Sequence, residues 1–210
     1  MSGPRFSVRR AYAHLRAVDP VVGGLIERHG PFRPRPSDDP YSALVRMILY
    51  QQLAGAAASA IERRWRSLYA DPDATPSPEQ ILGTGDDEFR GAGVSRQKAS
   101  YLRDLAASVQ AGRLDWQRLD GLADEEVVAD LTAVRGVGEW TAHMFLMFHL
   151  GRPDVLPVGD LGVRAGMRVA YGLDVAPTPA RAREIGAPWA PYRSVGSWYM
   201  WRAVEAAPPQ

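Results

Sequence analysis

The sequence contains no cysteine, and Lys98 is the only lysine among its 210 residues. Without cysteine the chain can form no disulfide, thiolate zinc site, iron–sulfur cluster or cysteine nucleophile. The spacing of the histidines does not favour a metal site either. His143 and His149 are separated by six positions in the sequence and would point about 120° apart on a helix, which makes them a poor metal-binding pair.

Long apolar runs and signal-peptide features are also missing. No window approaches the roughly 18 uncharged apolar residues of a membrane-spanning helix. The basic residues of segment 1–10 are not followed by an apolar stretch of signal-peptide length. We therefore expect no membrane partner and a cytoplasmic location. The net charge is only +1, so any binding of nucleic acid must depend on a local surface.

Strand patterns are scarce, and the predicted fold class is all-α. Residues 5–29 have a helical pattern with a break at Asp19-Pro20, and the proline-rich segment 30–40 marks a candidate boundary. Apolar residues that recur every three or four positions predict further helices. One such stripe runs from Tyr41 to Leu53 and is closed by Gly55, and other helices are expected at 56–69, 97–109, 124–134, 140–150 and 161–171.

Two glycines, Gly136 and Gly138, join the helices expected at 124–134 and 140–150. They permit a tight hairpin, and the free N–H groups at the start of the next helix could hold a phosphate. The same pattern also fits a simple turn between two helices. Helix 140–150 is apolar all the way round, so we expect it to be buried.

Five short segments follow one another along the chain. They are Ile48-Leu49-Tyr50-Gln51-Gln52-Leu53, Gly93-Val94-Ser95-Arg96-Gln97-Lys98-Ala99, Val134-Arg135-Gly136-Val137-Gly138-Glu139-Trp140-Thr141-Ala142, Leu156-Pro157-Val158-Gly159-Asp160, and Trp189-Ala190-Pro191-Tyr192-Arg193-Ser194 followed by Trp198 to Trp201. Each is weak alone, but the ordered set is specific. Together these segments resemble the helix-hairpin-helix DNA glycosylase superfamily, and most closely its 3-methyladenine DNA glycosylase II (AlkA-like) branch.

The resemblance implies one catalytic domain over residues 1–210, built from two lobes with the active-site cleft between them. Lobe A would span about 40–148 with the hairpin, and lobe B about 1–36 plus 150–210. One departure is that Val134-Arg135-Gly136 stands where the family commonly has Leu-Pro-Gly, which changes the entry turn but keeps the glycines. The residues before Tyr41 are too few for the N-terminal α/β domain of larger bacterial relatives, so the chain resembles the catalytic core alone.

Asp160 matches the catalytic aspartate of the family. An aspartate directly before a helix is also an ordinary N-cap, and the two roles are compatible. A carboxylate at this position could stabilise an oxocarbenium-like sugar or activate a water molecule. Glycosidases normally need a second acid to protonate the leaving group, and none stands near Asp160 in a comparable motif. An alkylated purine already carries positive charge, however, so one carboxylate can suffice.

Aromatic residues match the base pocket of the family. The resemblance places Trp140 and Met144 in this pocket and makes Trp201 the ring that stacks on the flipped base; a cationic base over an indole gains roughly 0.5–2 kcal/mol. Trp140 could equally be a core residue of an apolar helix. Lyase relatives carry a Schiff-base lysine where this chain has Trp140, so we expect no lyase activity. Core packing is expected for Trp189, Tyr192 and Trp198.

The remaining expected site residues would hold the DNA. By resemblance, Gln52 and Leu53 wedge into the duplex where the base has left, although Gln51-Gln52 could instead be a helix cap. The hairpin would bind the DNA backbone. It would also hold a monovalent cation, sodium or potassium, through backbone carbonyls, and no other cofactor is expected. The backbone-binding residues would be Gly136, Val137, Gly138 and Thr141, and the carbonyls those of Thr132, Val134 and Val137.

The sequence thus predicts a monomeric DNA-3-methyladenine glycosylase II, which flips an alkylated base out of double-stranded DNA and hydrolyses its N-glycosidic bond for base excision repair. A non-enzymatic hairpin DNA-binding module is one alternative, and Asp160 beside an aromatic pocket argues against it. A glycosylase for oxidised or mismatched bases is the other alternative, and a lost preference for cationic lesions would favour it.

Overall fold

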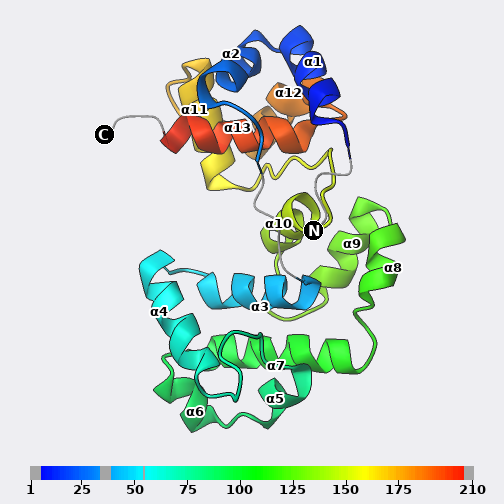
Figure 1. The fold of residues 1–210 in the computed structure, drawn as a ribbon. Helices are drawn as coiled ribbons and strands as arrows, with labels where there is room; N and C mark the ends of the chain where they lie inside the picture. Colours follow the sequence, from blue (N-terminus) through cyan, green and yellow to red (C-terminus); the bar gives the residue numbers. More distant parts are fainter. Residues whose placement is uncertain (1–5, 34–38, 54, 206–210) are drawn as a thin grey trace. The chain divides into compact units, whose positions relative to one another are not determined.

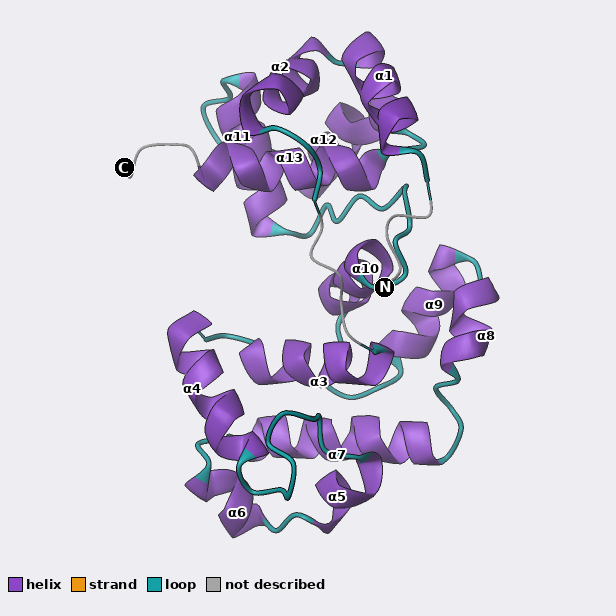
Figure 2. Ribbon diagram, in the orientation of Figure 1, coloured by secondary structure: helices purple, strands orange, loops and turns teal. Residues whose placement is uncertain are grey.

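The computed structural model describes residues 6–33, 39–53 and 55–205, and all regular structure within them is helical (Figure 2). The all-α prediction is confirmed. No helix in these ranges is both long and apolar enough to cross a bilayer. The helices are α1 (Val8–Val18), α2 (Pro20–His29), α3 (Pro40–Tyr50), α4 (Gly55–Arg66), α5 (Pro78–Gly83), α6 (Asp86–Gly91), α7 (Arg96–Gln110), α8 (Trp116–Gly121), α9 (Asp124–Thr132), α10 (Glu139–Phe148), α11 (Leu161–Tyr171), α12 (Pro179–Gly186), the 3-10 turn η1 (Ala187–Trp189) and α13 (Arg193–Glu205).

The chain divides into two compact units. Unit 1 comprises Met1–Pro36 and Leu146–Gln210, and unit 2 comprises Ser37–Phe145. The boundary at the C-terminal side falls within α10. The lobes expected from the sequence have nearly the same bounds. Part of the predicted linker 30–40 lies outside the described residues.

In unit 1 the N-terminal helices pack against the C-terminal ones, so the first and last parts of the chain share one core. Figure 1 shows α2 beside α11 and α13, and α1 packs against α2 and η1. The predicted helix break at Asp19 is confirmed, and it has a structural role. The Oδ1 atom of Asp19 caps α2 by accepting the N–H of Val21 at 3.0 Å. Its Oδ2 atom accepts the hydroxyl of Tyr171 at 2.5 Å and the indole N–H of Trp189 at 2.7 Å. Asp19 therefore joins three parts of the core of unit 1.

In unit 2, α3 and α7 lie side by side, α4 packs against α3, and the short helices α5 and α6 pack against α7 (Figure 1). The chain enters α7 at the N-cap Ser95, whose hydroxyl accepts the Lys98 N–H at 3.2 Å. Leu49, Leu102 and Leu105 are among the fully buried side chains of this unit. Packing of α3 on α7 therefore places the end of α3 close to Lys98, whose ammonium group donates to the Leu49 carbonyl.

Several sequence expectations need correction. Helix α3 ends at Tyr50, so Leu53 lies beyond it, and Gly55 begins α4 instead of closing α3. The short helices α5, α6 and α8 were not predicted. Each has six residues, which is less than two turns and too short to show an apolar repeat. Helix α10 is mostly buried, as expected, but Trp140 at its start is 47% exposed.

Candidate active site

Asp160 lies at the start of α11, at the end of a tight turn. The turn is closed by hydrogen bonds from Val158 N to Leu156 O and from Asp160 N to Pro157 O, both 2.9 Å. The Oδ1 atom of Asp160 then accepts the N–H of Val163 at 2.6 Å, which makes it the N-cap of α11. The residue is 9% exposed. The N-cap role is therefore confirmed, and it holds the carboxylate at the positive end of a helix.

Trp201 of α13 contacts the same carboxylate. Its indole N–H donates to Asp160 Oδ1 at 2.9 Å. The approach requires Gly162, because a Cβ there would lie 2.8 Å from Trp201 Cδ1 and 3.1 Å from Asp160 Oδ1. One helical turn later, a Cβ on Gly166 would lie only 2.1 Å from the carbonyl oxygen of Met200. Two glycines on one face of α11 thus let α13 come close enough for the indole to reach the carboxylate.

An open cavity lies beside Trp201 within unit 1, with a volume of about 560 Å³. One wall is aromatic, because the ring of Phe148 lies 5.8 Å from that of Trp201 at an angle of 35°. Glu205 is an acidic residue of the lining, and its carboxylate forms an ion pair with Arg202 at 2.6 Å. The cavity is lined by Arg33, Phe148, Gly162, Trp198, Trp201, Arg202, Val204 and Glu205.

These contacts define the chemistry that the site can support. Asp160 offers a carboxylate whose direction is set by a backbone N–H and an indole N–H, so it is held in place before any substrate arrives. A fixed carboxylate of this kind stabilises positive charge that develops close to it. The aromatic wall at Trp201 suits a flat, electron-poor ring, since indole attracts cations. The sequence predicted Asp160 and Trp201 as site residues, but not the hydrogen bond between them.

The other two residues expected in the base pocket lie on α10, in unit 2. Trp140 and Met144 are one helical turn apart and share a face of the helix. Met144 is 6% exposed, whereas Trp140 is 47% exposed. The alternative of Trp140 as a core residue is therefore wrong. A tryptophan with half of its surface in solvent is available to contact a ligand.

The hairpin between α9 and α10 is a tight glycine turn. Gly136 has a φ of 82°, and a Cβ there would lie 2.2 Å from the ring of Tyr101 on α7. By contrast, a Cβ on Gly138 would meet nothing within 4 Å. Arg135 stands where the family commonly has proline, and its N–H donates to Asp104 Oδ2 at 2.8 Å. Proline has no N–H to give, so Asp104 compensates for this departure by fixing the entry of the hairpin.

The proposed wedge residues lie in the turn after α3. Gln52 has a φ of 56° and is exposed, and Leu53 is 38% exposed. Gln51 is the C-cap residue of α3, and its backbone N–H donates to Ile48 O at 3.3 Å, but its side chain does not cap the helix. Its Nε2 atom donates to the carbonyl oxygen of Gly136 at 2.7 Å. The structure therefore brings the wedge turn and the hairpin together within unit 2.

The backbone carbonyls expected to hold a cation lie around the same hairpin. The carbonyl of Val134 accepts the N–H of Val137 at 3.1 Å. A carbonyl oxygen has two lone pairs, so this bond leaves capacity for a cation. Carbonyl oxygens are suitable ligands for sodium or potassium, and the residues fit such a site.

Thr141, expected to contact the DNA backbone, is only 3% exposed. No cluster of three or more side-chain metal ligands occurs among the described residues.

Sequence reasoning did not identify Gly162, Phe148, Asp104 or the role of Gln51. Gly162 had a detectable signal, because a glycine in the first turn of a predicted helix indicates a close approach. The other three make contacts that depend on how distant segments pack. The bidentate pair of Arg193 with Asp154 also depends on tertiary packing, because its partners are 39 positions apart in the sequence. Of the C-terminal aromatics, Trp189 is fully buried, as expected.

Comparisons with known proteins identify the family of the chain and its relatives in fold. The profile of the family described as "HhH-GPD superfamily base excision DNA repair protein" matches residues 45–191. DNA-3-methyladenine glycosylase 1 of Schizosaccharomyces pombe is 32% identical over 205 residues, which cover 96% of this chain and 90% of the relative. A structure of S. pombe 3-methyladenine DNA glycosylase in complex with abasic DNA has a TM-score of 0.86 at 32% identity, and the match covers 94% of this chain and 98% of that one. A DNA-3-methyladenine glycosidase structure from Bacillus halodurans has a TM-score of 0.84 at 38% identity, with 93% and 89% covered.

Proposed function

This chain belongs to the HhH-GPD superfamily of base excision DNA repair proteins, and from that premise we propose that it is a DNA glycosylase for alkylated bases. The observation that carries the proposal is the carboxylate of Asp160, held between the N-terminus of α11 and the indole N–H of Trp201. The names of the relatives in S. pombe and B. halodurans support 3-methyladenine and related alkylated purines as substrates. We assign the enzyme to the type II, AlkA-like branch.

In the proposed reaction, the bond between C1′ of the sugar and the alkylated base breaks. Its electron pair leaves with the base, which was cationic and departs neutral. Asp160 stabilises the positive charge that develops on the sugar ring, and water then adds to C1′. The proton lost by the water passes to the Asp160 carboxylate or to solvent. Because the base needs no protonation, one carboxylate is sufficient for this hydrolysis.

Trp201, Trp140 and Met144 are the proposed base-contacting residues. The indole rings favour a cationic base over a neutral one by roughly 0.5–2 kcal/mol. The exposure of Trp140 and the cavity beside Trp201 support these roles. The preference for alkylated bases would therefore come from electron-rich aromatic rings rather than from hydrogen bonds to the base.

We propose that the enzyme is monofunctional and leaves the DNA strand intact. Lyase activity needs an amine that forms an imine with the sugar C1′. Trp140 occupies the family position of that amine, and Lys98 is committed elsewhere, because its Nζ atom donates to Leu49 O at 2.5 Å in unit 2. The proposed DNA-holding elements are the wedge residues Gln52 and Leu53 and the hairpin, whose N–H groups would bind a phosphate and whose carbonyls would bind sodium or potassium.

The experiment that tests this function is incubation with methylated duplex DNA and chromatographic identification of the free bases released. Release of 3-methyladenine without strand nicking before alkali would support the proposal. Binding without release would favour the non-enzymatic module, and release of oxidised or mismatched bases instead would favour the second alternative. A covalent adduct trapped by borohydride would contradict the monofunctional mechanism.

A further inference from the structure

The turn that carries the proposed wedge is held by three side chains before any DNA binds. We call residues Leu49–Leu53 the wedge segment. Its backbone is irregular, since Gln52 is the one non-glycine residue with a positive φ in the described part of the chain. A φ of 56° is unfavourable for residues other than glycine and persists only when the surroundings hold it. Contacts of Lys98, Glu62 and Gln51 hold the segment.

The first anchor comes from α7. The ammonium group of Lys98 donates to the carbonyl of Leu49 at 2.5 Å, and this carbonyl belongs to the last turn of α3, where helix carbonyls lack partners within the helix. Burial lowers the pKa of Lys98 below its usual value. Lys98 is the only lysine of the chain, and it stabilises the end of the helix that leads into the wedge segment.

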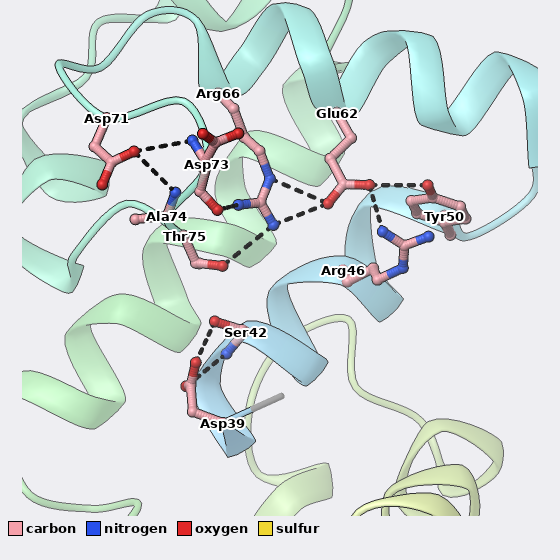
Figure 3. A network of polar contacts seen from close by, with 10 residues as sticks. All are labelled: Asp39, Ser42, Arg46, Tyr50, Glu62, Arg66, Asp71, Asp73, Ala74 and Thr75. Atoms are coloured by element: carbon pink, nitrogen blue, oxygen red, sulfur yellow. Dashed lines mark hydrogen bonds and ion pairs between the residues drawn. The ribbon is translucent and has the colours of Figure 1, made fainter. Parts of the chain in front are cut away.

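The second anchor is the buried carboxylate of Glu62 on α4, which is 6% exposed. Figure 3 shows it between Arg66 on one side and Arg46 and Tyr50 on the other. Glu62 Oε2 accepts the Tyr50 hydroxyl at 2.8 Å and a guanidinium N–H of Arg46 at 2.7 Å, and Oε1 accepts two N–H groups of Arg66 at 3.0 and 3.2 Å. Burial and this hydrogen bond raise the pKa of Tyr50, so the phenol remains a donor at neutral pH.

The third anchor reaches the hairpin. Gln51 Nε2 donates to the carbonyl of Gly136 at 2.7 Å, across 85 positions of sequence. Gly136 is itself fixed, because the ring of Tyr101 packs against the place where a Cβ would stand. The amide of Gln51 therefore connects two rigid structures. One is the wedge segment, held by Lys98 and Glu62, and the other is the hairpin.

We infer that Gln51 is a positioning residue that sets the wedge relative to the hairpin, so that both engage the duplex at the separation needed for base flipping. The inference rests on the proposed function. The adjacent Gln52 enters the DNA, whereas Gln51 acts only through the Gly136 carbonyl. Loss of this hydrogen bond leaves the phosphate contacts of the hairpin in place but lets the wedge segment shift. Flipping of the base then weakens while binding to undamaged duplex stays the same.

The test is Gln51→Met, which keeps the length of the side chain and removes its N–H donors. The substrate is a duplex that carries 2-aminopurine next to a 2′-fluoro alkylated nucleotide, whose glycosidic bond resists hydrolysis, so fluorescence reports flipping alone. We expect the flipping equilibrium and the saturating single-turnover rate on hydrolysable DNA to fall together by about three- to tenfold, the range for loss of one hydrogen bond. The affinity for undamaged duplex and its salt dependence should not change.

Gln80→Met is the matched control. Gln80 is also in unit 2, and its amide oxygen accepts the Ser77 N–H at 2.8 Å in the capping box of α5. Gln80→Met should lower the melting temperature without changing flipping. Gln51→Glu gives a second variant, in which a carboxylate faces the Gly136 carbonyl, and it should reduce flipping more than Gln51→Met does.

The outcomes separate the inference from the proposed function. If the parent protein releases no base from methylated DNA, the proposed function fails. If the parent is active but Gln51→Met flips the base as well as the parent does, the inference is wrong. An equal loss in Gln80→Met would also overturn it, because the effect would then come from general destabilisation of unit 2.

Discussion

The two units of this protein build their functional residues in different ways. In unit 1 the contacts that hold the proposed catalytic carboxylate and the core join side chains far apart in sequence. Asp160 and Trp201 are 41 positions apart, and Asp19 and Trp189 are 170 positions apart. In unit 2 most polar side chains act locally, as in the capping box that begins α5 and the Glu88 carboxylate that accepts the Gly85 N–H at the start of α6, and the hairpin presents backbone groups. Gln51 and Lys98 are among the exceptions, and both hold the wedge segment. Asp104, which accepts the Arg135 N–H, is another.

This difference separates the proposed chemistry, in unit 1, from the proposed DNA binding, in unit 2. In unit 1 the proposed chemistry uses a charged side chain, so it depends on where α11 and α13 place Asp160. In unit 2 the proposed DNA binding uses backbone N–H groups at a turn, so it depends on the local backbone shape and on free space for a phosphate. Variants of Asp160 and its neighbours in unit 1 should therefore change the rate of base release, and variants of the hairpin and the wedge segment in unit 2 should change DNA affinity or flipping. Four variants test this division.

The largest effect is expected from Asp160→Asn. The amide oxygen of asparagine can still accept the N–H groups of Val163 and Trp201, so the geometry is kept and only the charge is lost. Removal of an electrostatic contribution of this type costs about 10²- to 10³-fold in rate. We expect base release to fall at least that far in single-turnover assays on methylated duplex. Affinity for the same DNA, measured by fluorescence anisotropy, should not change.

Asp160→Asn also tests the division itself. If it releases base at a rate near that of the parent, the carboxylate does not carry the chemistry and the proposed mechanism is wrong. If it instead loses DNA affinity, unit 1 contributes to binding and the two units are not separable in function.

A smaller loss is expected from Gly162→Ala, which leaves the catalytic group untouched. The new Cβ would lie 2.8 Å from Trp201 Cδ1 and 3.1 Å from Asp160 Oδ1, so the indole and the carboxylate must separate. Misplacement of reacting groups by a fraction of an ångström to one ångström lowers rates by about 10- to 100-fold. Gly159→Ala is the control, since a Cβ there meets nothing within 4 Å. Equal activity in Gly162→Ala and the parent would show that the contact between Trp201 and Asp160 is dispensable.

The third variant, Gly138→Asp, concerns unit 2. A Cβ at Gly138 meets nothing within 4 Å, so the hairpin should keep its fold while it gains a negative charge where a phosphate is expected. We expect duplex affinity to fall about tenfold at low salt, and the slope of log affinity against log salt to decrease by about 0.9, as for one lost phosphate contact. Gly138→Ala should bind like the parent. Unchanged affinity of Gly138→Asp at every salt concentration would exclude a phosphate at this hairpin.

The same contrast explains what could be predicted from the sequence. The bounds of α11 agree with the predicted 161–171 because its apolar repeat is long and its N-cap is an aspartate. Asp160 could be identified as a candidate because a turn and a helix start are local features. Its contact with Trp201 was not predicted, since it depends on how closely α13 packs against α11.

Unit 2 shows the opposite case. The glycines of the hairpin were recognised from sequence alone, because a tight turn between two helices is a local feature. The role of Gln51 was not recognised. A glutamine at the end of a helix commonly acts as a cap, and only tertiary packing brings the Gly136 carbonyl within its reach. Likewise, Asp104 was not identified as the partner of Arg135, because α7 and the hairpin are distant in sequence.

The smallest effect is expected from Asp154→Asn, which tests whether long-range contacts in unit 1 stabilise more than local pairs in unit 2. Asp154 receives two side-chain hydrogen bonds from Arg193, at 2.7 and 2.8 Å. Burial alone would raise the pKa of Asp154, but the hydrogen bonds and charge of Arg193 outweigh it and hold the pKa below its usual 3.8. A group whose pKa is lowered by folding contributes stability above its unfolded pKa and loses it as the pH falls through the folded pKa. Asp154→Asn should therefore lower the free energy of unfolding by about 1 kcal/mol at pH 7. The difference from the parent should shrink below about pH 4 in thermal melts followed by circular dichroism.

The control is Asp87→Asn in unit 2, whose carboxylate pairs with Arg90 three positions away and is 88% exposed. This control should leave the melting temperature unchanged at every pH. A difference for Asp154→Asn that does not shrink at all as the pH falls below 4, or one matched by Asp87→Asn at pH 7, would contradict the view that unit 1 depends more on distant side-chain pairs than unit 2 does.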